Sequence, residues 1–104
     1  MHPSKVVRAQ VRQLTDLPNV GRAVAADLRR IGINTPADLV DREALDLYRQ
    51  LCVATGVRQD PCMLDTMMSI THFVAGGEPQ PWWAFTAERQ RRWPSPADQT
   101  GGVV

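Results

Sequence analysis

The sequence has no long apolar run and little cysteine, and both absences narrow the class of protein. No stretch approaches the roughly 18 apolar residues that a membrane-spanning helix needs, and no apolar segment that would form a signal peptide follows the basic N-terminal residues. Cys52, Cys62 and His72 are widely and evenly spaced, whereas structural zinc sites use close cysteine pairs. We therefore expect a cytoplasmic protein that binds no metal or other cofactor and does not enter a membrane.

The alternating pattern of β-strands is also missing. No run of alternating polar and β-branched or aromatic residues lasts four positions. Apolar residues recur instead at helical spacing, as Val7, Val11 and Leu14 do. With 104 residues the chain is long enough for one hydrophobic core. We predict a single all-α domain over residues 1–92 and a flexible tail over residues 93–104, where Pro and Gly are frequent.

Capping patterns divide this domain into five or six short helices. Gly32 stands where a helix end requires a left-handed residue, and Pro36 and Asp38 follow Thr35 as in a capping box. Asp60 and Pro61 form a second N-terminal signal. The expected helices cover about residues 4–15, 20–30, 36–40, 41–55, 61–75 and 86–92, with N-caps that include Ser4, Thr35, Asp41 and Asp60.

The net charge is only +1, but it is unevenly distributed along the sequence. Residues 1–30 contain six basic and two acidic side chains, whereas residues 31–80 contain three basic and seven acidic ones. A basic first part suits contact with a polyanion such as nucleic acid. Chance asymmetry among solvated helix faces is the alternative explanation.

The run from Leu17 to Arg22, with the sequence Leu-Pro-Asn-Val-Gly-Arg, predicts a tight turn that leads into a helix. Such a turn presents unpaired backbone N–H groups at a helix N-terminus, where the helix dipole also favours phosphate. Together with Ala25, Leu28 and the Ile-Gly-Ile at 31–33, the run resembles the helix-hairpin-helix motif. In many repair and recombination proteins this motif contacts the DNA backbone without reading sequence. The resemblance implies a nucleic-acid-binding site formed by Asn19, Val20, Gly21, Arg22 and Arg29.

Within this site, the backbone N–H groups of Val20 and Gly21 are the expected phosphate donors, assisted by Arg22 and Arg29. Asn19 stands where the motif usually has a glycine, and asparagine tolerates a positive φ better than other non-glycine residues. We expect Asn19 and Gly21 to adopt conformations that β-branched residues cannot. A purely structural helix connection, or a protein-docking surface, is the alternative interpretation of the same turn.

A longer series of motifs resembles a small bacterial family known as pathogenicity-locus or mitomycin-resistance proteins. The resemblance extends from about Leu14 to Phe85, and it is carried by Leu17–Gly21, Ile31–Leu39, Leu47–Cys52, Arg58–Cys62 and Trp82–Phe85. The part up to Leu51 is also similar to the C-terminal domain of TfoX-type competence regulators. These resemblances imply a SAM-like helix-hairpin-helix fold and a link to DNA damage or resistance.

Two further groups of residues have both a functional and a structural interpretation. Cys62 follows a predicted N-cap, where the helix N-terminus and Arg58 would lower a thiol pKa, but a packed structural cysteine fits as well. His72 lies about 15 Å along the same helix and has no evident catalytic partner, so we expect no enzyme activity. Trp82 and Trp83 are either a base-stacking platform or a dock for the C-terminal segment.

The leading hypothesis is a small non-catalytic module that binds DNA backbone phosphates without sequence specificity. One hairpin with few arginine contacts predicts weak, salt-sensitive binding. The competing hypothesis is a SAM-like protein–protein interaction module that binds a protein partner through the acidic residues of 31–80 or through the tryptophan pair.

Overall fold

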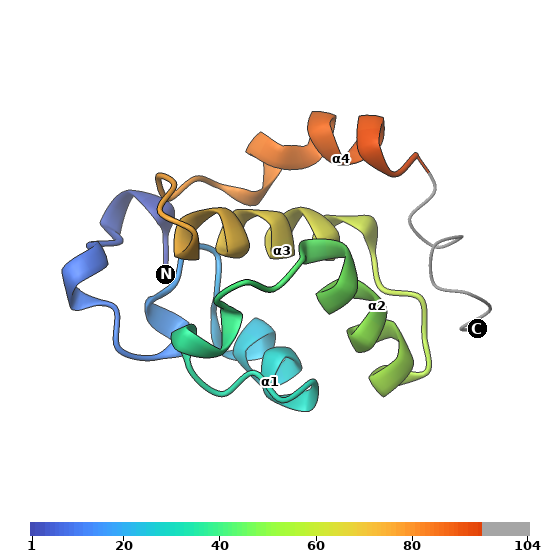
Figure 1. The fold of residues 1–104 in the computed structure, drawn as a ribbon, viewed down its shortest axis with the longest axis horizontal. Coiled ribbons are helices and arrows are strands. Elements are labelled where there is room, and N and C mark those ends of the chain that lie inside the picture. The colour runs from blue at the N-terminus through green and yellow to red at the C-terminus, as the bar shows by residue number, and fades with distance from the viewer. Residues whose placement is uncertain (95–104) are drawn as a thin grey trace.

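The computed structural model describes residues 1–94, and this part of the chain is helical (Figure 1). It contains four α-helices and five short 3-10 helices, and no strand occurs in residues 1–94. The all-α prediction is therefore confirmed, although several of the expected short helices are 3-10 turns. The α-helices are α1 (Arg22–Arg30), α2 (Ala44–Thr55), α3 (Pro61–Val74) and α4 (Thr86–Arg92). None of the helices in this part is long and apolar enough to cross a membrane.

The expected helix over residues 4–15 is wrong. The segment forms three separate 3-10 helices, η1 (Pro3–Lys5), η2 (Arg8–Gln10) and η3 (Leu14–Asp16). Val6, Val7 and Val11 lie between them with extended backbone, at ψ values of 126°, 114° and 117°. β-Branched side chains favour extended backbone over helix, so the valines that gave the helical spacing also interrupt the helix.

The predicted stop at Gly32 is confirmed, and so is the predicted start at Asp60. Gly32 has a φ of 84°, and the N–H of Ile33 donates to the carbonyl of Leu28 at 3.0 Å, which satisfies the end of α1. Asp60 caps α3 by accepting from the Cys62 N–H at 2.9 Å. Asp41 is not an N-cap, because it has a φ of 62° and α2 begins only at Ala44.

One local structure occurs twice along the chain, and its parts follow one another at the same intervals in both copies. In each copy an aspartate accepts two backbone N–H bonds, at 2.9 and 3.1 Å, and so closes a 3-10 helix: Asp16 in η3 and Asp38 in η4 (Pro36–Leu39). A left-handed residue follows, Asn19 in the first copy and Asp41 in the second. The helices α1 and α2 then begin at matching positions. The segment from η3 to α2 is therefore a structural repeat of cap, turn and helix.

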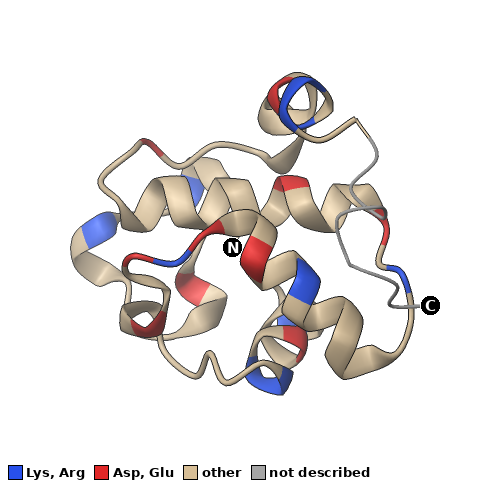
Figure 2. Ribbon diagram, turned by 45° about the vertical axis from the view of Figure 1, so that its right-hand side comes forward, with Lys and Arg blue, Asp and Glu red and all other residues tan. Residues whose placement is uncertain are grey.

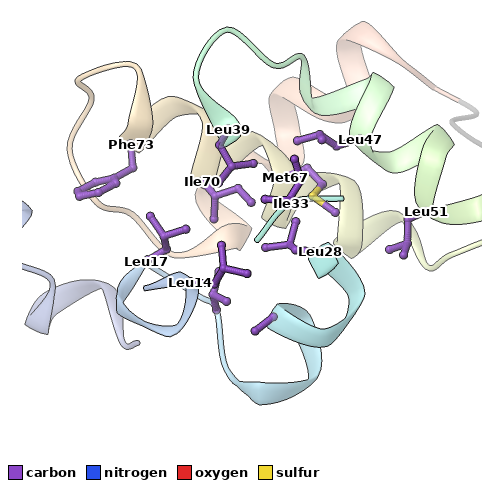
Figure 3. Close-up of a cluster of buried hydrophobic side chains, with 12 residues drawn as sticks. Leu14, Leu17, Leu28, Ile33, Leu39, Leu47, Leu51, Met67, Ile70 and Phe73 are labelled. Carbon is purple, nitrogen blue, oxygen red and sulfur yellow. The ribbon is translucent and has the colours of Figure 1, made fainter. Parts of the chain in front are cut away.

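Helix α3 is central to the core and is covered on two sides. On one side Met67, Ile70 and Phe73 pack among residues of η3, α1, η4 and α2 (Figure 3). The buried members of this cluster are Leu14, Leu17, Val20, Ala25, Leu28, Ile33, Leu39, Leu47, Leu51, Met67, Ile70 and Phe73. On the other side of α3, Leu64 and Met68 pack with Tyr48 and Cys52, under partly buried Phe85 and Trp93.

A buried carboxylate attaches α4 to α3. Asp65 is fully buried, and its two oxygens lie 2.8 Å from Arg89 Nε and 2.8 Å from Thr86 Oγ, which donate to it. This ion pair fixes α4 and the preceding 3-10 helix η5 (Trp82–Phe85) against α3. Trp93, at the start of the predicted tail, packs on the second core cluster, and residues 95–104 of that tail lie outside the described residues.

Candidate nucleic-acid interface

The turn between η3 and α1 contains one residue in an unusual backbone conformation. Asn19 has a φ of 66°, as predicted for the position where the motif usually has glycine. Gly21, the N-cap of α1, has a φ of −99° and a ψ of −167°, which is extended backbone open to any residue. A Cβ atom at Gly21 would meet nothing within 4 Å. The expectation that Gly21 is needed for its conformation is therefore wrong, and only Asn19 has that role.

The backbone donors at this turn differ in their availability. Val20 is fully buried, and its N–H already donates to the carbonyl of Leu17 at 3.3 Å. The N–H of Gly21 has no acceptor within residues 1–94. The N–H groups of residues 22–24 belong to the first turn of α1 and have no partner within the helix. The open donors are thus those of Gly21 and the first turn of α1, and Val20 instead anchors the turn in the core.

Two arginines on α1 have no partner within residues 1–94. Arg22 and Arg29 are both exposed and lie about two helical turns apart, so they share one face of the helix. Neither makes an ion pair or a side-chain hydrogen bond with any described residue. Arg30 is different, because its Nε lies 3.9 Å from a carboxylate oxygen of Asp27. Arg22 and Arg29 therefore remain available to an external anion.

Two other arginines of the N-terminal segment donate hydrogen bonds to backbone carbonyls of the protein. The guanidinium of Arg8 donates to the carbonyls of Phe73 at 2.7 Å and Gly77 at 2.6 Å, and it lies 4.0 Å from the centre of the Phe73 ring. Arg12 donates to the carbonyl of Ala9. Figure 2 shows acidic and basic segments interspersed around the molecule. Arg8 and Arg12 are consequently less available to an external anion than Arg22 and Arg29 on α1.

The second copy of the repeat lacks the chemistry for anion binding. Asp41 takes the place of Asn19, and Glu43 is the N-cap of α2 where Gly21 is the N-cap of α1. Two carboxylates at these positions would repel a phosphate group. The two copies share their backbone geometry, but in the second copy Arg42 lies between two carboxylates and pairs with Asp46 at 3.5 Å, whereas the turn of the first copy has no carboxylate at the corresponding positions.

The side chain of Asn19 points inward and joins the turn to a distant segment. Its Nδ2 donates to Ser69 Oγ at 2.7 Å and to the carbonyl of Gln80 at 2.9 Å. Its Oδ1 accepts from the backbone N–H of Trp82 at 3.3 Å. The sequence predicted the backbone conformation of Asn19 but not these partners, because no local pattern relates residues so far apart. Asn19 thus places η5 directly beside the turn.

An open cleft of about 350 Å³ lies between the turn and η5. Its walls include Pro3, Asn19, Gly21, Trp82 and Trp83. Trp83 is 61% exposed, and its ring meets that of Trp82 edge to face, with centres 5.6 Å apart and planes at 84°. The structure therefore brings the turn between η3 and α1 and the tryptophan pair to one place on the surface.

Comparison with known proteins identifies the family. The family model described as pathogenicity locus matches residues 7–91. The chain belongs to the pathogenicity locus family. It is similar to the mitomycin resistance protein McrB of Streptomyces lavendulae, with 49% identity over 78 residues that cover 75% of this chain and 74% of that protein. No solved structure is significantly similar to the chain. The family resemblance stated from the motifs is confirmed.

In this member of the pathogenicity locus family the environment of Cys62 opposes thiolate formation. Burial raises the pKa of the Cys62 thiol, and the hydrogen bond and charge of Asp60 raise it further. The charge that lowers this pKa is that of Arg89 rather than the predicted Arg58, and its effect is outweighed, so the predicted lowering is wrong. Residues 1–94 also contain no group of three or more His, Cys, Asp or Glu side chains that could hold a metal ion. Cys62 is partly buried, and its surroundings oppose the reactive-thiol interpretation.

Proposed function

We propose that this protein is a small non-catalytic module that binds DNA backbone phosphates without sequence specificity, in a role linked to DNA damage or drug resistance. The observation that carries the proposal is the exposed N-terminus of α1, where open N–H groups lie beside Arg22 and on the same helix as Arg29, both without a partner in the described part of the chain. Backbone donors and the helix dipole favour an anion at this position, and arginine adds bidentate contacts. The similarity to a mitomycin resistance protein supports the link to resistance.

The proposed contacts divide the predicted site into binding and supporting residues. Gly21, Arg22 and Arg29 face solvent and would contact phosphate. Val20 and Asn19 would support them, since Val20 is buried in the core and the side chain of Asn19 is bonded to η5. Because no base-reading group is required for these contacts, binding would be independent of sequence.

The test is the salt dependence of binding to a duplex. We expect the double variant Arg22→Gln, Arg29→Gln to weaken binding to all sequences alike and to reduce the log–log salt slope by about 0.9 for each lost phosphate contact. The matched control is Arg91→Gln, which removes an exposed arginine from α4 and should change the slope less. The proposal fails if the wild-type protein does not bind DNA at about 50 mM salt, where electrostatic binding is strong.

A SAM-like protein–protein interaction module is the second candidate, and one surface feature favours it. An open recess of about 480 Å³ lies between the end of α1 and α2, with Ile31, Val53 and Ala54 as its apolar lining and Arg30 and Arg49 among its walls. Val53 is 63% exposed there. If this candidate is correct, Val53→Asp should abolish binding of a protein partner, whereas Arg22→Gln should have no effect on DNA binding because there would be none.

A further inference from the structure

We infer that the cleft between the hairpin turn and η5 receives an unpaired DNA base, so that the protein binds single-stranded DNA in preference to a blunt duplex. The inference rests on the proposed function, because the base would belong to a nucleotide whose phosphate contacts the N-terminus of α1. It goes beyond that function in assigning a binding role to Trp83 and in naming the DNA structure that is preferred.

The first observation is that Trp83 is a large apolar side chain held in solvent. It is 61% exposed, in a molecule whose other large aromatic side chains are buried or partly buried within residues 1–94. The edge-to-face contact with Trp82 limits the orientation of its ring. Trp82 itself is fixed, because its backbone N–H donates to Asn19 Oδ1. An indole that is both exposed and oriented is suited to stacking on a flat partner.

The second observation is that the indole of Trp83 lies beside the N-terminus of α1. Gly21 lines the same cleft, and the open backbone N–H groups run from Gly21 along the first turn of α1. Arg22, which has no partner among the described residues, is next in sequence. A nucleotide offers this combination, an aromatic face on one end and a phosphate on the other. An apolar protein segment would leave the donors and Arg22 without a partner. Charge complementarity therefore selects a nucleotide as the occupant.

The base that stacks on Trp83 must be unpaired. In a duplex each base is stacked between its neighbours, so its face is not available to a tryptophan. In single-stranded nucleic acid the faces are accessible, and stacking on aromatic side chains is tolerant of sequence because every base has such a face. At about 350 Å³ the cleft lies at the lower end of the usual range for ligand sites, about 300–1,000 Å³. This volume suits one base with its sugar.

The experiment combines one side-chain truncation with removal of the bases. Fluorescence anisotropy would measure the binding of wild-type protein and Trp83→Ala to a single-stranded oligonucleotide, and to a fully abasic oligonucleotide of the same length. We expect Trp83→Ala to weaken binding to the single strand by about 5- to 150-fold, the range found for stacked aromatic residues. On the abasic strand the same substitution should have no effect, because only the phosphates remain.

Two control variants separate stacking from loss of apolar surface. Trp83→Phe retains an aromatic face and should recover most of the binding to the single strand. Val53→Ala removes an equally exposed apolar side chain from the recess between α1 and α2 and should leave binding unchanged. Because Trp83 is largely exposed, the variants should keep the helical circular-dichroism spectrum of the wild-type protein.

The outcomes distinguish this inference from the function on which it rests. Equal losses on the normal and abasic strands, or an equal loss on a blunt duplex, would overturn the role of Trp83 in base stacking. If Trp83→Ala binds the single strand like wild type while Arg22→Gln weakens it, the inference fails and the proposed function stands. If the wild-type protein binds neither the abasic strand nor the duplex at about 50 mM salt, both fail.

Discussion

The substitution Asn19→Gly isolates the role of one side chain in joining the hairpin turn to η5. Glycine adopts the φ of 66° at this position at least as readily as asparagine, so the turn itself is not strained by the change. What is lost is the set of three hydrogen bonds to Ser69, Gln80 and the backbone of Trp82. Once the backbone freedom that glycine adds to the unfolded chain is subtracted with a control, the loss of stability reports on these bonds.

The expected loss can be estimated from the geometry of these bonds. The bonds to Ser69 and Gln80 are short, at 2.7 and 2.9 Å, and each contributes about 1 kcal/mol net. The bond from Trp82 is longer, at 3.3 Å, and contributes less. The carbonyl of Gln80 keeps a second donor, because Ser69 Oγ also donates to it at 2.8 Å. We expect the free energy of unfolding to fall by about 2 kcal/mol.

Urea unfolding followed by circular dichroism measures this change. Asn34→Gly is the matched control, because Asn34 is exposed and its side chain makes only one long bond, of 3.4 Å, to the carbonyl of Gly32. The control removes the same side chain and adds the same backbone freedom, and it should cost less than about 1 kcal/mol. Should the two variants be equally stable, Asn19 would not join the turn to η5, and the position of the cleft would need another cause.

Three further predictions follow from other contacts. Asp65→Ala leaves the guanidinium of Arg89 buried without a counter-charge and should lower the free energy of unfolding by about 3–5 kcal/mol in urea titrations. The control Glu88→Ala breaks an exposed ion pair and should cost less than about 1 kcal/mol, so similar losses would contradict the role of the buried pair. Hydrogen bonds from backbone N–H groups lower the pKa of Asp38, so its contribution to stability is present above its unfolded pKa and is lost as the pH falls through its lower folded pKa. Asp38→Asn should therefore lose less stability than the wild-type protein between neutral pH and about pH 3, and an unchanged pH dependence would refute this. The Cys62 thiol, whose pKa is raised by burial and by Asp60, should react slowly with a thiol reagent at neutral pH, and Asp60→Asn should accelerate the reaction; fast labelling of the wild-type protein would restore the reactive-thiol interpretation.

The elements that could be predicted from the sequence are those with local capping signals. Gly32 with Ile33, and Asp60 with Pro61, specify helix boundaries through hydrogen bonds that reach only a few residues along the chain. The left-handed conformation of Asn19 was predictable for the same reason, since it depends on one residue and its turn. The family could likewise be inferred from short motifs, and the comparison confirms it.

Most features that escaped prediction depend on contacts between distant segments. The helix expected over residues 4–15 does not form, and part of that segment is held by Arg8, whose guanidinium reaches two carbonyls near the end of α3. These same bonds remove Arg8 from the basic surface that the charge count predicted. No local pattern in the sequence relates Arg8 to Phe73 or Asn19 to Gln80. Charge counts therefore fail where tertiary contacts decide the use of a side chain, and helical spacing fails where β-branched residues favour extended backbone.

The two turns of the repeat differ in chemistry because one has Asn19 and the other has Asp41 at the left-handed position. Both turns need a residue that accepts a positive φ, and asparagine and aspartate are both suited to it. Only the asparagine amide can donate to the carbonyl of Gln80 while its oxygen accepts from the N–H of Trp82. An aspartate at position 19 would lose the donor and would bring a carboxylate to the N-terminus of α1. Asn19 therefore permits the turn, positions the tryptophan pair and keeps the site free of negative charge, whereas Asp41 permits the turn alone.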